Sequence, residues 1–102
     1  MDNHGVPTEI PTTVRIAGIE FDRVVYDAGG DVLYLHVGEP ATAVDWDATP
    51  EGHATRYGLD GSLVGITIVN ARGLQEREGT IVLTLPEHRV EAPDLRHVIS
   101  AA

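Results

Sequence analysis

The chain has 102 residues, and it carries seven basic residues, all arginine, against 16 acidic ones, which gives a net charge of −9. This length is typical of a single domain. Because so acidic a chain repels polyanions, its charge argues against direct binding to nucleic acid or to an anionic membrane surface. The hydrophobic fraction of 42% predicts a folded core, and the aromatic fraction of only 5% predicts that aliphatic side chains build it.

Cysteine is absent, which excludes disulfides, thiol catalysis and cysteine-bound metals. The start of the chain lacks the basic and apolar regions of a secretory leader, and no apolar run is long enough to cross a membrane. We therefore expect a cytoplasmic protein, and we expect no cofactor. The acidity is uneven, because residues 1–50 hold nine acids and two arginines whereas residues 51–102 hold seven acids and five arginines. An acidic surface is expected mainly in the first half.

Residues 1–12 contain Gly5, Pro7 and Pro11 and show no periodicity, so they are predicted to form a flexible N-terminal tail. Residues 13–102 are predicted to form a single β-rich domain. Its first strand is expected near residues 14–18, where Val14 and Ile16 alternate with other residues.

Residues 21–37 read as two strands around a turn that contains Gly29 and Gly30, which we expect to adopt a positive φ. Alternation in the second strand predicts two faces, one with Leu33, Leu35 and Val37 and the other with Val32, Tyr34 and His36. Because neither face is fully polar, we expect a helix to cover one face and a second subunit to cover the other.

Residues 43–49 predict a short edge strand, with Asp45 and Asp47 on one face and Trp46 on the other. Residues 53–71 predict a second hairpin around Asp60-Gly61, a pair that favours a two-residue turn in which both positions have a positive φ. In its second strand, Ile66 and Ile68 are predicted core residues.

Residues 70–79 are polar and predict about one helical turn, and residues 80–85 predict a strand that ends at Pro86. Residues 93–102 predict a helix, since Leu95, Val98, Ile99 and Ala102 form one apolar stripe. The expected fold is mainly β, or α+β with little helix. It is an antiparallel β-meander of about five to six strands with a short C-terminal helix.

Two segments carry a resemblance to a known family. Residues 25–35 read Val-Tyr-Asp, a short turn, and then Asp-Val-Leu-Tyr-Leu; residues 59–71 read as an acidic turn followed by Val-Gly-Ile-Thr-Ile. Together they resemble the two signatures of the uncharacterised domain-of-unknown-function family 2283 over residues 21–74. Thr67 stands where that family usually has an acid. The resemblance implies a small bacterial β-rich domain and makes an antitoxin-like role conceivable.

Two pairs of carboxylates are candidate cation or ligand sites. Asp27 and Asp31 flank the first turn, where they could bind a hard cation or could accept hydrogen bonds from turn amides. Asp45 and Asp47 lack the other ligands of a calcium loop, so the alternative is a solvated edge strand. None of the five histidines is spaced as a paired metal ligand, so a zinc site would have to assemble from distant segments, and we predict no metal site. We also predict no catalytic residues, because the sequence contains no nucleophile motif and no glycine-rich phosphate loop.

Aromatic residues give a third kind of candidate. Trp46 and Tyr57 either form an exposed contact for a partner or fill a small core. Tyr34 and His36 are further candidates, either for an interaction surface or, with Asp27 and Asp31, for a small hydrolase or ligand-binding site. The candidate interaction residues are Asp27, Asp31, Tyr34, His36, Asp45, Trp46, Asp47 and Tyr57.

The leading functional hypothesis is a non-enzymatic acidic module for protein–protein interaction, expected to be a homodimer and to bind a protein partner of basic character. Direct nucleic-acid and membrane partners are not expected. The alternatives are a small ligand- or cation-binding protein or hydrolase at the Asp27/Asp31 hairpin, and a structural domain of a larger homo-oligomer.

Overall fold

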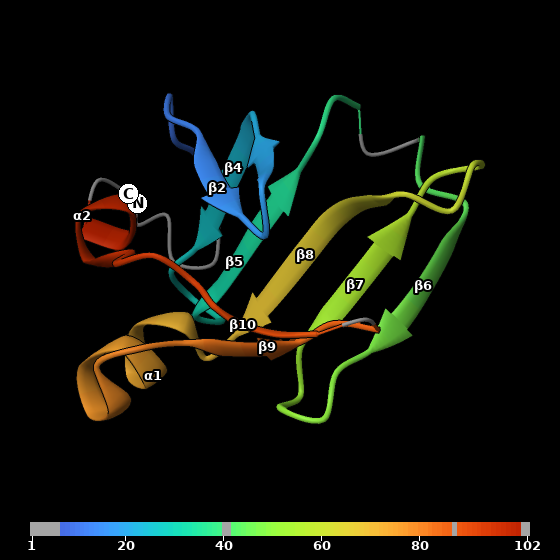
Figure 1. The fold of residues 1–102 in the computed structure, drawn as a ribbon. Helices are drawn as coiled ribbons and strands as arrows, with labels where there is room; N and C mark the ends of the chain where they lie inside the picture. Colours follow the sequence, from blue (N-terminus) through green and yellow to red (C-terminus); the bar gives the residue numbers. More distant parts are fainter. Residues whose placement is uncertain (1–6, 40–41, 87, 101–102) are drawn as a thin grey trace.

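The fold is mainly β, as predicted, and is seen in a computed structural model that describes residues 7–39, 42–86 and 88–100 (Figure 1). A six-stranded antiparallel sheet has the order β1-β4-β5-β8-β7-β6. Its strands are β1 (Thr8–Glu9), β4 (Arg23–Asp27), β5 (Val32–His36), β6 (Asp45–Ala48), β7 (Ala54–Tyr57) and β8 (Leu63–Val69). The order of the strands in the sheet differs from their order in the chain, because β8 lies between β5 and β7.

The predicted first hairpin is present as β4 and β5, paired from Arg23–His36 to Asp27–Val32. Its turn differs from the expectation, because neither Gly29 nor Gly30 has a positive φ and the left-handed residue is Asp31, with φ 55°. Aspartate tolerates this conformation better than most residues, because its short side chain can bond to nearby backbone.

The second predicted hairpin is β7 and β8, and Ile66 and Ile68 are buried as expected. The connection runs over residues 58–62, and a β-bulge interrupts the register between Arg56 and Tyr57. Only Gly61 of the predicted turn pair has a positive φ. The loop is therefore longer than the two-residue turn that the Asp-Gly pair suggested.

One face of the sheet carries the hydrophobic core. The elements against it are the hairpin β2–β3 (Val14–Ile16 and Ile19–Phe21), the hairpin β9–β10 (Val82–Thr84 and Arg89–Glu91), and the helices α1 (Ala71–Glu78) and α2 (Arg96–Ser100). In Figure 1 both hairpins and α2 lie on the same side of the sheet. Buried Phe21, Leu33, Ile68, Leu83 and Leu95 are among the residues that fill the space between the layers.

Several element boundaries differ from the predictions. Within the segment predicted as a tail, Thr8–Glu9 pairs with β4 as strand β1, and the next residue, Ile10, is buried; residues 1–6 lie outside the described residues. Helix α1 has eight residues where one turn was predicted, whereas α2 has five. Of the predicted apolar stripe, Leu95, Val98 and Ile99 are buried and Ala102 lies outside the described residues.

Candidate interaction surface

The second face of the sheet, opposite the core, is the candidate surface, and we call it the open face. Cross-strand partners share a face, so the register places its residues in three rows across the strands. The middle row is Glu9, Val25, Tyr34, Thr67, Ala54 and Ala48. The first row is Arg23, His36, Gly65, Arg56 and Trp46, and the third row is Asp27, Val32 and Val69.

Large apolar side chains on the open face are accessible to solvent. Trp46 is 66% exposed, Val69 44% and Tyr34 40%, whereas Leu33 and Leu35 on the other face of β5 are almost wholly buried. Trp46 is thus an exposed aromatic, which excludes the expectation that it fills a small core. The described hairpins and α2 lie on the core side of the sheet (Figure 1).

His36 is buried although it belongs to the open face. Its Nδ1 lies 2.9 Å from the carbonyl oxygen of Val37, to which it donates, and its Nε2 is buried with no hydrogen-bond partner among the described residues. The ring lies against Gly65, where an added Cβ would come within 2.8 Å of His36 Cδ2. The missing side chain at Gly65 therefore lets the ring lie close to the sheet.

The two aspartates of the edge strand β6 accept hydrogen bonds from backbone amides of the same strand. The Thr49 amide donates to the His53 carbonyl oxygen beside β7, and successive amides of a strand point alternately toward and away from the neighbouring strand. The amides of Trp46 and Ala48 therefore point away from β7, to the free edge of the sheet. Asp45 Oδ1 accepts the Trp46 amide and Asp47 Oδ1 accepts the Ala48 amide, both at 2.8 Å. Both outward amides of the strand are thus occupied by carboxylates of the same strand.

Asp31 is held by hydrogen bonds to helix α1. Its Oδ1 accepts the Arg72 amide at 2.7 Å and its Oδ2 the Gly73 amide at 3.1 Å, while its backbone oxygen accepts the Ala71 amide. Asn70, the residue before the helix, supplies no side-chain cap. Asp31 therefore caps α1 from a distant turn, a role that chain position alone could not reveal.

Tyr26 completes this cluster. Its hydroxyl donates to Asp31 Oδ1 at 2.7 Å, and the Arg72 guanidinium lies 6.0 Å from its ring centroid. Burial, which alone would raise the pKa of Asp31, is outweighed by the hydrogen bonds from Arg72, Tyr26 and Gly73, so the pKa is lowered. Burial and the bond to Asp31 raise the pKa of Tyr26.

Asp27, the other half of the predicted pair, accepts the amides of Gly29 and Gly30 at its Oδ1. Asp27 therefore bonds to the turn amides, as the structural alternative expected, whereas Asp31 bonds to the amides of a distant helix. Among the described residues, no group of three or more His, Asp or Glu side chains is placed to hold a metal ion.

Tyr57 lies apart from the other aromatic candidates. Its register partner is Asp45, it follows the buried Thr55 on the core side, and its hydroxyl accepts a bond from the Thr55 hydroxyl at 3.0 Å. With Ile19, Leu63 and Leu85 it lines an open hollow at the end of the core. The structure does not bring Tyr57 together with Tyr34 and Trp46.

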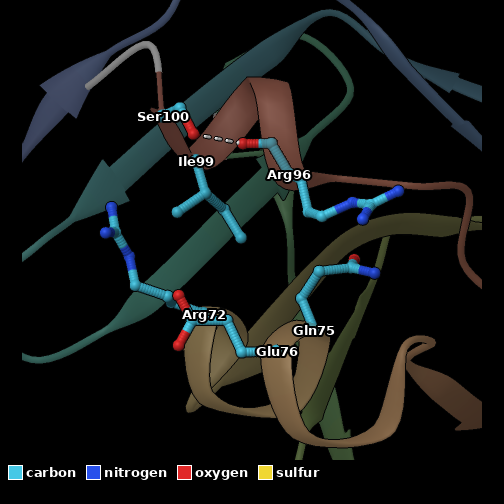
Figure 2. A pocket seen from close by; sticks show the side chains of 6 residues that line it. All are labelled: Arg72, Gln75, Glu76, Arg96, Ile99 and Ser100. Carbon is cyan, nitrogen blue, oxygen red and sulfur yellow. Dashed lines mark hydrogen bonds between the residues drawn. The ribbon is translucent and has the colours of Figure 1, made fainter.

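A second hollow lies between α1 and α2 (Figure 2). Gln75 spans it: the side-chain Nε2 donates to Gly79 O at 3.0 Å, and Oε1 accepts the Leu95 amide at 3.2 Å. Arg96 is paired with Asp94, and the hydrogen bonds from Arg96 lower the pKa of Asp94 to about 2. Gln75 therefore connects α1 to the residue before α2, and Arg96 is engaged by a carboxylate beside its own helix.

His53, which the sequence did not single out, is buried beneath the sheet. Its Nδ1 accepts the Val69 amide at 3.1 Å, and its Nε2 has no partner among the described residues. Burial lowers the pKa of His53, although nearby Glu51 opposes the shift. Glu51 itself accepts bonds from the Thr84 hydroxyl and amide, which lower its pKa to about 2 and attach β9 to the β6–β7 turn.

Comparisons with known proteins return no matching family model, no matching curated protein and no matching solved structure. The resemblance to domain-of-unknown-function family 2283 stays a prediction. In the part of the chain that the structure describes, no helix is long and apolar enough to cross a membrane.

Proposed function

We propose that this chain is a non-enzymatic module for protein–protein interaction and that the open face is its docking surface. The observation that carries the proposal is the exposure of Tyr34, Trp46 and Val69 on a sheet whose other face holds the core. Tyr and Trp are the side chains most enriched in the centres of protein interfaces. The small residue Ala54 lies between them in the register, next to Ala48 on β6.

A photoreactive side chain at position 46 tests this proposal. We would replace Trp46 with p-benzoylphenylalanine, an aromatic of similar size, and irradiate the purified protein in extract from its own cells. The matched control carries the same residue at position 59, because Leu59 is 90% exposed but lies in the β7–β8 loop. We expect a protein adduct from position 46 and little from position 59.

The mass of the adduct identifies the partner class. One chain has a mass of 11.0 kDa, so an adduct of twice that mass contains a second copy and any other mass contains a different protein. Either adduct supports the proposed function. Equal yields from the two positions, or no adduct from position 46, would contradict it.

The acidity of the chain supports a basic protein as an additional partner at the β6 edge. Asp45 and Asp47 lie there beside Trp46, and all four residues of β6 are exposed. Opposite charges speed association most at low salt. The double variant Asp45→Asn/Asp47→Asn should lose salt-sensitive binding that Glu76→Gln/Glu78→Gln, with the same change in charge on α1, retains. Equal loss in both variants would show that only net charge matters.

A further inference from the structure

We propose that the occupant of the open face is a second copy of this chain, related by a two-fold axis that crosses the strands along the middle row. This inference rests on the proposed function and names its partner. In this arrangement Tyr34 and Thr67 each face their own counterpart. The first row of each copy lies against the third row of the other, as in an isologous interface.

The charge of the open face favours this occupant. Its three rows hold two arginines, Arg23 and Arg56, and two acids, Glu9 and Asp27. Over the described residues of the three rows the charges therefore cancel, and Glu39 adds one carboxylate at the margin, 3.4 Å from Arg23, whereas the whole chain has a net charge of −9. A strongly basic partner would gain little there, but two neutral faces can approach without the repulsion that the rest of the surface would impose.

The positions of these charges select one orientation. An axis along the middle row places Arg23 opposite the partner's Asp27, and the symmetric contact repeats this pair. The same axis places Glu9 opposite the partner's Glu9, but each Glu9 carboxylate lies 3.3 Å from Arg23 Nε of its own chain. An axis parallel to the strands, between β5 and β8, would instead place Arg23 opposite the partner's Arg56. Like charges face to face in an interface are costly. The axis across the strands brings together two Arg–Asp pairs and one pair of glutamates that are each matched by an arginine of their own chain, whereas the other axis brings together two Arg–Arg pairs. The axis across the strands is therefore the more complementary one.

The size of the face predicts a weak dimer. Six strands about 4.8 Å apart and rows that span about 17 Å give a footprint of roughly 400 Å² per copy. This is about half of the 800 Å² per partner that a standard stable interface buries. We therefore expect dissociation at micromolar or higher concentrations, with monomer and dimer in measurable exchange.

The alternative way to join two copies, by pairing β6 with β6, is opposed by the edge itself. Its outward amides at Trp46 and Ala48 are occupied by Asp45 and Asp47. Antiparallel pairing of two such edges would also bring these carboxylates close to those of the second strand, which is destabilising. Self-association through the open face leaves these edge amides and carboxylates out of the contact.

Two measurements test the proposal. Sedimentation equilibrium of the wild type and of Thr67→Arg, over roughly 10 to 500 µM, covers the range expected for a weak dimer. We expect concentration-dependent dimer for the wild type and its loss for Thr67→Arg, which places two arginines across the axis. Leu59→Arg, with the same charge change in the exposed β7–β8 loop, should dimerise like the wild type.

A cross-link reports the axis without depending on a disruptive variant. The chain has no cysteine, so Thr67→Cys provides a unique thiol. Facing sheets lie about 10 Å apart, too far for a disulfide, and a short bis-maleimide spans that gap. We expect covalent dimer from Thr67→Cys and little from Leu59→Cys.

A wild type that stays at monomer mass over the whole range would overturn the inference, and so would equal cross-linking of the two cysteine variants. Neither result affects the proposed function if position 46 still captures another protein. The loss of every position-46 adduct would remove the proposed function itself.

Discussion

The carboxylate of Asp31 accepts a hydrogen bond from the backbone amide of Arg72 at 2.7 Å, although the two residues are 41 positions apart. The bond joins the β4–β5 turn to the start of α1. It explains why α1 begins where it does, since Asn70 offers no side-chain cap. It also shows why one aspartate of the turn has a structural role beyond its own hairpin.

We predict that Asp31→Asn destabilises the fold by about 1–3 kcal/mol, because it weakens the cap and the bond from the Tyr26 hydroxyl. Asparagine tolerates the left-handed backbone at this position, so the variant changes mainly the carboxylate. Urea unfolding gives the free energy, and hydrogen exchange at Arg72 and Gly73 locates the loss. Asp27→Asn, in the same turn, should cost less; an equal cost with unchanged exchange in α1 would refute the capping role.

We predict that Gly65→Ala destabilises the fold by roughly 1–3 kcal/mol, because the new methyl group would push the His36 ring away from the sheet. The control is Gly30→Ala, where the nearest atom to an added Cβ is at 3.5 Å and φ is not positive. Thermal unfolding of both variants compares them. If Gly65→Ala were as stable as Gly30→Ala, close packing of His36 would not explain the glycine.

We predict that Asp45→Ala/Asp47→Ala makes the protein associate through β6. The change frees the outward amides of Trp46 and Ala48 and removes the repulsion that keeps edges apart. Light scattering and thioflavin fluorescence during incubation should both rise. Glu76→Ala/Glu78→Ala removes the same charge from α1, and its light scattering and thioflavin fluorescence should stay unchanged. A similar rise of both signals in this control would attribute the association to net charge alone.

We predict that stability falls as the pH drops below about 6.5, the ordinary value of histidine, because burial lowers the pKa of His53 in the folded state. Over that range the unfolded chain binds a proton that folded His53 does not, which favours unfolding. The fall should continue until the pH reaches the folded pKa. His53→Gln should be less stable at neutral pH but should show a shallower slope between pH 6.5 and 5; an unchanged slope would rule out His53 as its source.

Local pattern was enough to predict the two central hairpins. Strand alternation around Gly- and Asp-containing turns placed β4–β5 and β7–β8, and it identified Ile66 and Ile68 as core. The C-terminal apolar stripe likewise placed Leu95, Val98 and Ile99 against the sheet. These elements follow from side-chain period and turn chemistry, which are local properties.

The remaining features depend on contacts between distant segments. Strand β1 follows Pro7 and has two residues, so only its pairing with β4 makes it a strand. The role of Asp31 required α1 to lie nearby, and the exposure of Trp46 required knowledge of which face of the sheet the core covers. A sequence pattern could name Asp31 and Trp46 as candidates, but it could not choose between their structural and interaction roles.

Hydroxyl-radical footprinting tests the central claim, that the open face binds protein, most directly. Labelling of Tyr34, Trp46 and Val69 would be compared between dilute protein and its complex, formed with a second copy at high concentration or with a captured partner. We predict that these side chains become protected while Leu59, on the loop, keeps its reactivity. Unchanged labelling of Tyr34 and Trp46 in a proven complex would contradict the claim.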